Sequence, residues 1–260
     1  MKILRDIYYI TNFKTIFVTF LSILATWVCI KYQIHADLPI ALVSIAIIFP
    51  VVFAINSAYA RRERGLINLG ECRGFLLGFY RMAADHPKEA DPAVTADIKA
   101  KILVLFKALK LFLESDQKHS RDLETAVYDG IKELSVASKT LVTYGLHGRS
   151  VSRMVVFLTK FTIAFEEMRT IFYYRTPIGL RAYGKFFLLA FPILYAPSFA
   201  LLASKFYGPA TNFNYLIPTI YTIILVSLDN IQEQLENPFD QYGADDIAIN
   251  LADIERMLDK

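Results

Sequence analysis

The chain alternates between long uncharged runs and stretches of mixed polarity. The uncharged runs cover residues 15–30, 38–60, 186–204 and 206–228. A helix of about 20 apolar residues spans the hydrocarbon core of a bilayer. Lys14 and Lys31 extend the short first run, because long basic side chains reach to the membrane interface. The pattern predicts four transmembrane helices, arranged as two hairpins because the first two runs and the last two runs are separated by short connections.

Basic residues flank these runs unevenly. The two short connections hold only Lys31 and Lys205. The other basic residues near the runs are Lys2, Arg5, Lys14, Arg61, Arg62, Arg64, Arg73, Arg175, Arg181 and Lys185. Because basic residues are retained on the cytoplasmic side of a membrane, we expect both termini and the central region to be cytoplasmic. The chain is predicted to be a multi-pass protein of the cell (inner) membrane, without a cleaved signal peptide.

The region between the second and third runs is predicted to be helical. Apolar residues recur there at spacings of three and four, in the series Ile98, Ile102, Leu105, Leu109, Phe112 and the series Leu123, Val127, Ile131, Leu134. No stretch alternates as a strand would, so we predict an all-α integral membrane protein. Its expected parts are residues 1–60 (amino-terminal segment and first two spans), 61–185 (helical cytoplasmic region), 186–230 (last two spans) and 231–260 (cytoplasmic tail).

Composition agrees with a membrane protein and narrows its partners. Hydrophobic residues make up 55% of the 260 residues, and the mean hydropathy is +0.37, both high for a soluble domain. A formal net charge of +3, with no basic tract interleaved with aromatics, argues against nucleic acid as a partner. Membrane lipid is the expected partner. Cys29 and Cys72 are far apart in sequence, and we expect both to be reduced packing residues.

The sequence shows no sign of catalysis, so the chain is predicted not to be an enzyme. Its four histidines are isolated from one another, and the adjacent Glu166 and Glu167 point in different directions on a helix. The uncharged runs contain no acid or base, which disfavours a proton relay or an ion-coupled transporter but leaves a passive pore open. Glycines at helical spacing indicate close helix packing more than phosphate binding, and they are Gly65, Gly70, Gly74 and Gly78.

Two further features have alternative interpretations. Ile45, Phe49 and Phe53 recur every fourth residue and share one helix face, which points either to lipid and neighbouring helices or to an axis shared with other subunits. After the fourth run, Pro238 ends a helix and acidic residues follow it. Such acids can serve as calcium ligands, but calcium takes about six to eight oxygens, so a solvated acidic turn is the alternative.

Four blocks of the sequence are similar to the bestrophin family, ion channels in which five subunits surround one pore. The blocks are residues 56–61 with Gly65 and Gly70, the face of Ile45, Phe49 and Phe53, residues 167–169 with 176–178, and residues 234–239 with the acids that follow. The chain departs from the family where Arg62 and Glu63 replace an aromatic pair. The resemblance extends from the amino-terminal segment to the acidic tail.

This resemblance implies a bestrophin-like homopentamer with four transmembrane helices per subunit. Ile45, Phe49 and Phe53 would line its hydrophobic pore neck. Small monovalent ions would pass, an anion such as chloride being favoured over a cation. The resemblance also implies a calcium clasp at Gln234, Asn237 and Asp245, although Tyr242 stands where an acid is expected. The alternative function is a non-enzymatic membrane-anchored scaffold whose cytoplasmic half binds a partner.

Overall fold

The computed structural model describes residues 11–85, 92–116, 120–206, 212–243 and 246–259, and every regular element in these ranges is a helix. The chain forms two compact units. Unit 1 comprises Met1–Ala60 and Thr176–Glu236, and unit 2 comprises Arg61–Arg175 and Asn237–Lys260. The long helix α3 (Ile40–Asp85) contributes its first half to unit 1 and its second half to unit 2.

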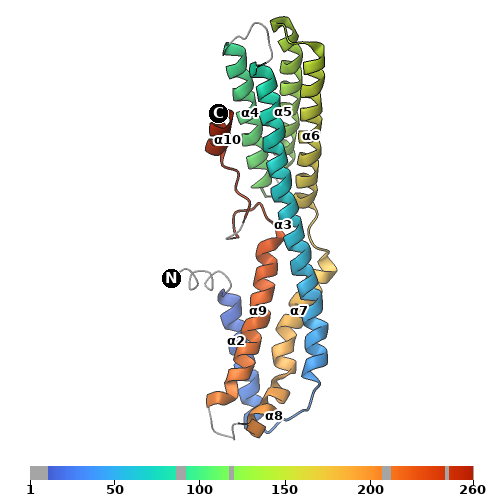
Figure 1. Cartoon of the computed structure of the whole chain (residues 1–260). Helices are drawn as coiled ribbons and strands as arrows, with labels where there is room; N and C mark the ends of the chain where they lie inside the picture. The colour runs from blue at the N-terminus through green and yellow to red at the C-terminus, as the bar shows by residue number, and fades with distance from the viewer. Residues whose placement is uncertain (1–10, 86–91, 117–119, 207–211, 244–245, 260) are drawn as a thin grey trace. The chain divides into compact units, whose positions relative to one another are not determined.

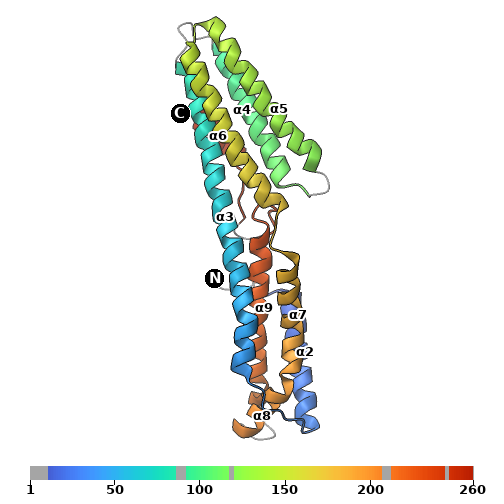
Figure 2. The same ribbon diagram turned by 90° about the vertical axis from the view of Figure 1, so that its right-hand side faces the viewer.

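Unit 1 is a bundle in which α2, α7, α9 and the start of α3 lie side by side (Figure 1, Figure 2). Its other helices are α2 (Phe13–Lys31), α7 (Ile178–Leu194), α8 (Ala196–Phe206), the 3-10 turn η3 (Asn212–Tyr215) and α9 (Leu216–Glu236). Asn12 caps α2, because its side chain accepts a hydrogen bond from the Thr15 backbone N–H and the Thr15 hydroxyl lies near the Asn12 N–H in return.

Polarity in α2 is reversed relative to a helix of a water-soluble protein. Its buried positions include the hydroxyl residues Thr15, Ser22 and Thr26, all at most 2% exposed. Its large apolar residues face outward, and they are Phe13, Ile16, Phe17, Phe20, Leu24 and Trp27. An apolar outer surface is stable against lipid, whereas small hydroxyl residues let neighbouring helices approach closely. Within the described residues, α2 and the part of α3 from Ser44 are each long and apolar enough to cross a membrane.

The last two uncharged runs do not coincide with helices. The third run divides into α7 and α8 at Tyr195, two residues before Pro197, which has no N–H to continue a helical hydrogen-bond ladder. In the fourth run α9 begins only at Leu216, after the polar turn η3, and continues to Glu236. Beyond the run, α9 continues through Asp229 and Glu233, which pair with Lys14 and Lys185 inside unit 1.

Unit 2 has the polarity of a water-exposed bundle, with apolar residues inside. It comprises the second half of α3, α4 (Pro92–Leu113), α5 (Ser120–Thr140), the 3-10 turn η2 (Leu141–Tyr144), α6 (Gly148–Tyr173) and α10 (Leu251–Leu258). The predicted series on α4 is confirmed, since all five of its residues are at most 1% exposed, and Val127 and Leu134 on α5 are fully buried. Cys72 is free and buried as expected, and burial raises the pKa of its thiol.

The segment after α9 folds into unit 2. Helix α9 ends at Glu236, directly before Asn237 and Pro238, as predicted. Phe239 is 1% exposed and packs against α3, where a Cβ at Gly65 would lie 3.0 Å from the tip of its ring. Gly78 is similarly crowded by Phe157 of α6, whereas Gly70 and Gly74 face open space. The packing role predicted for the four glycines is therefore found at two of them in the single chain.

Candidate pore-lining site

The three predicted neck residues lie together on one exposed face of α3. Ile45, Phe49 and Phe53 are 62%, 61% and 56% exposed. The rings of Phe49 and Phe53 meet edge to face, with centroids 4.8 Å apart and planes at 82°, an arrangement that the aromatic quadrupole favours. In the single chain this face is an open apolar stripe, which no described part of unit 1 covers.

The opposite face of α3 is packed into unit 1. Ile47, Val51 and Ala54 are at most 3% exposed. Ile47 belongs to an apolar cluster whose other buried members are Leu188, Phe191, Tyr195, Phe199 and Leu225, from α7, α8, α9 and the joint between α7 and α8. Because this face packs inward, Ile45, Phe49 and Phe53 are directed away from the rest of the unit.

A proline creates a specific polar contact behind this face. Pro50 lies inside α3 and has no N–H, so the carbonyl of Ala46, four residues earlier, loses its helical donor. The hydroxyl of Tyr183 on α7 donates to that carbonyl over 3.3 Å. Two residues earlier on α3, the hydroxyls of Ser44 and Tyr221 share a hydrogen bond of 2.7 Å. Both contacts tie α3 to the helices at its back.

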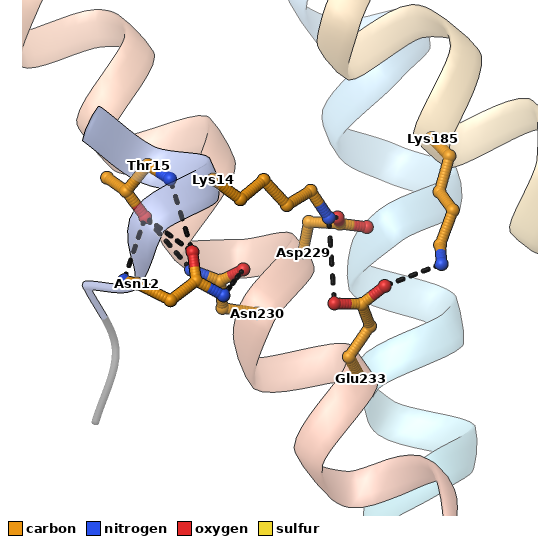
Figure 3. Close-up of polar contacts among 7 residues, drawn as sticks. All are labelled: Asn12, Lys14, Thr15, Lys185, Asp229, Asn230 and Glu233. Carbon is orange, nitrogen blue, oxygen red and sulfur yellow. Dashed lines mark hydrogen bonds and ion pairs between the residues drawn. The ribbon is translucent and has the colours of Figure 1, made fainter. Parts of the chain in front are cut away.

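A row of charged side chains joins the helices α2, α9 and α7 of unit 1. We call this row, Lys14, Asp229, Glu233 and Lys185, the charged ladder. Figure 3 shows Lys14 of α2 reaching Asp229 and Glu233 on α9, while Lys185 of α7 approaches Glu233 from the other side. Lys14 Nζ pairs with Asp229 and lies 3.6 Å from Glu233, and Lys185 Nζ lies 2.5 Å from Glu233.

The outer end of the ladder keeps both of its charges over a wide pH range. Burial by itself would raise the pKa of Glu233, but the hydrogen bonds and positive charges of Lys185 and Lys14 outweigh it and lower that pKa. The hydrogen bond to Glu233 raises the pKa of Lys185. Both groups therefore stay ionised near neutral pH.

In unit 2 an exposed ion pair joins α3 to α6. Arg64 donates to both carboxylate oxygens of Glu167, over 2.7 and 3.0 Å, and the Asn68 amide donates to the same carboxylate. These contacts lower the pKa of Glu167, with the hydrogen bond from Arg64 as the largest cause. The bond to Glu167 likewise raises the pKa of Arg64.

The residues predicted to bind calcium do not form a metal site within the described parts of the chain. Gln234 lies in the last turn of α9, Asn237 is 7% exposed at the start of the following segment, and Asp245 lies outside the described residues. Burial raises the pKa of Asp246 to about 6; the Gly243 N–H opposes that shift, and Asp240 adds to it. No group of three or more acidic, histidine or cysteine side chains gathers there among the described residues. The calcium clasp at Gln234, Asn237 and Asp245 therefore stays a prediction.

The sequence pattern predicted that Ile45, Phe49 and Phe53 share one helix face, but it did not predict the charged ladder. We expected Lys14 to reach the membrane interface, and the structure instead pairs it with Asp229, 215 residues away. One signal was available, because Asp229 follows the last uncharged run immediately and falls on a helical face with Glu233 and Glu236. A carboxylate at the end of a span needs a cationic partner.

These features define the class of the molecule: an all-helical membrane protein with an outward apolar helix surface. No family model matches the chain, and no curated protein matches it. Several solved structures, in contrast, match the chain. A crystal structure of a membrane protein has a TM-score of 0.81 at 18% identity, covering 95% of this chain and 98% of its own. A mutant bacterial Bestrophin homolog from Klebsiella pneumoniae has a TM-score of 0.80 at 19% identity, covering 94% and 97%.

A second crystal structure of the Klebsiella pneumoniae homolog has a TM-score of 0.78 at 18% identity, covering 94% of this chain and 96% of its own. The chain thus has the fold of bacterial bestrophin homologues over nearly its whole length. The resemblance seen in the sequence is confirmed at the level of fold.

Proposed function

We propose that the protein is a bestrophin-type ion channel, in which identical subunits surround a pore lined by α3. The observation that carries this proposal is the two-sided character of α3, whose back is packed and whose front is an open stripe of Ile45, Phe49 and Phe53. Around a shared axis, copies of each residue would form stacked apolar rings. Such a neck excludes water unless it is wide enough to stay wet, so a small rotation of α3 opens or closes it.

The proposed assembly is a homopentamer in the cell (inner) membrane, with four spans per subunit and both termini in the cytoplasm. The spans within residues 1–60 and 186–230 would contact lipid, while 61–185 and 231–260 would form the cytoplasmic part together with the amino terminus. The apolar outer face of α2 supports a lipid environment for unit 1, and the apolar core of unit 2 supports an aqueous one.

The permeant species we propose are small monovalent ions, with chloride favoured. Phenylalanine edges carry partial positive charge, so rings whose edges face the axis stabilise anions, whereas faces turned inward stabilise cations. Reversal potentials under a potassium chloride gradient distinguish the two orientations directly, because the sign of the potential follows the more permeant ion.

The proposal is tested with purified protein in planar bilayers. Wild-type protein should conduct without a partner, and Phe49→Ala or Phe53→Ala should raise the unitary conductance because the neck widens. Phe17→Ala is the matched control, since Phe17 is an equally exposed ring on the lipid-facing side of α2. Wild-type protein that does not conduct would favour a membrane-anchored scaffold, and unchanged currents in both neck variants would remove the neck assignment.

A further inference from the structure

The two ends of the charged ladder differ in burial. The inner pair is enclosed, with side-chain exposures of 29% for Lys14 and 3% for Asp229, whereas the outer pair has 52% for Lys185 and 38% for Glu233. Removing one member of a buried ion pair leaves an uncompensated charge in a low-dielectric site. Exposed pairs contribute much less. The inner pair is therefore the part of the ladder that most strongly fixes helix positions.

Other polar contacts hold the same helix ends. The Asn230 amide donates to Thr15 Oγ1 over 3.0 Å, and Asn12 and Asn230 exchange side-chain hydrogen bonds. On the other side of α9, Arg181 lies 3.4 Å from Glu236. The end of α9 is thus held by α2 on one side and by α7 on the other (Figure 3).

Two of the helices joined by the ladder, α7 and α9, also pack against α3. Leu188 and Phe191 of α7 and Leu225 of α9 share the apolar cluster with Ile47 of α3. Val51 Cγ2 lies 3.8 Å from the position that a Cβ would take at Gly184 of α7. A displacement of α7 or α9 is transmitted to α3 through these contacts, because close-packed side chains move together.

We propose that Lys14, Asp229, Glu233 and Lys185 are positioning residues for conduction, which hold α7 and α9 against the back of α3 and so set the fraction of time for which the neck is open. The inference rests on the proposed channel function and adds to it a determinant of gating. The ladder acts through α7 and α9 and contacts no ion in the pore. A substitution in the ladder should therefore alter the open probability and leave the unitary conductance unchanged.

The direction of the effect follows from the exposed stripe. Packing of Ile45, Phe49 and Phe53 against their copies across the axis lowers the free energy of the assembly, because it removes apolar surface from water. The contacts that hold α3 against α7 and α9 oppose this inward movement of the neck residues. A broken ladder should therefore favour the collapsed, dry neck and lower the open probability.

The test is single-channel recording from full-length protein in planar bilayers. Lys14→Met and Asp229→Asn should each lower the ratio of open to closed time by about tenfold, within the range of coupling between sites in proteins. The double variant should lose no more than either single variant, because partners in one contact are not additive. Lys14→Arg keeps the charge and should restore wild-type gating.

Controls separate this effect from loss of folding and from failure of the channel proposal. Lys31→Met removes a lysine from the other end of α2 and should gate as wild type. Glu233→Gln changes a more exposed carboxylate and should show a smaller shift in the same direction, even where the inner variants fail to fold. Wild-type currents with unchanged gating in Asp229→Asn and Glu233→Gln would overturn the ladder proposal alone. Absence of wild-type current would overturn the proposed function itself.

Discussion

Tyr183 shows how one side chain compensates for a feature of another helix. The carbonyl of Ala46 has no helical donor because residue 50 is proline, and the Tyr183 hydroxyl supplies one. A carbonyl left unpaired in an apolar environment costs free energy that water would otherwise offset. Proline can therefore lie inside α3, next to Phe49, without leaving the Ala46 carbonyl unpaired.

Replacing this hydroxyl should destabilise unit 1 measurably. We expect Tyr183→Phe to lower the free energy of unfolding by about 1 kcal/mol, the usual net contribution of one hydrogen bond. Thermal unfolding in detergent measures the change. Tyr174→Phe, at a residue that is 74% exposed, provides the control. Equal melting temperatures for the Tyr183→Phe variant and the wild type would show that the Ala46 carbonyl is satisfied in another way.

The Arg64–Glu167 pair makes the junction of α3 and α6 sensitive to acid. The pKa of Glu167 is lower in the folded chain than in the unfolded one, so its contribution to stability is fully present above the unfolded pKa of about 4. That contribution is lost as the pH falls through the lower, folded value. Unfolding of wild type and Glu167→Gln followed between pH 7 and about pH 3 should show a steeper acid loss in the wild type. Parallel curves would contradict the pair's role.

At the scale of elements, α3 is the helix on which both units depend. Its glycines offer a matched comparison, because a Cβ at Gly65 would lie 3.0 Å from Phe239 and 3.2 Å from Ile247, whereas Gly70 has open space. Phe239 and Ile247 are at most 4% exposed and have little room to move. The tail segment after α9 can therefore pack closely on α3 because glycine at residue 65 has no side chain in the way.

We expect the two alanine substitutions to change the free energy of unfolding differently. Gly65→Ala should destabilise unit 2 by about 1–3 kcal/mol, as overpacking does. Gly70→Ala should be neutral or stabilise by up to about 1 kcal/mol, since alanine is the better helix former. Denaturant unfolding of both variants against the wild type measures the difference. A Gly65→Ala variant as stable as Gly70→Ala would show that the packing around Phe239 is loose.

At the scale of the whole molecule, the proposed function has other subunits covering the open stripe on α3. We expect native mass spectrometry of detergent-solubilised protein to show an assembly of five chains of 29.6 kDa. A helix face this apolar should not remain open where water enters. A monomer at low micromolar concentration would contradict the proposed assembly, whereas another closed ring would revise only the number of subunits.

Much of this organisation can be predicted from periodicity, and the remainder depends on distant contacts. The series that begins at Ile98 is buried as its spacing predicts, because repeated apolar positions define one helix face. The break at Tyr195 and the late start of α9 could not be found from charge alone, since uncharged residues form turns as well as helices. The pairing of Lys14 with Asp229 joins residues far apart in sequence, which local pattern does not encode.

The most direct measurement of the central claim is block of single-channel current by a charged thiol reagent at Phe49→Cys. The native cysteines, Cys29 and Cys72, are buried. Val51→Cys, on the packed face of the same helix, is the matched control. The account predicts rapid block of Phe49→Cys and none of Val51→Cys. Complete labelling of Phe49→Cys with no change in current would contradict a pore lined by α3.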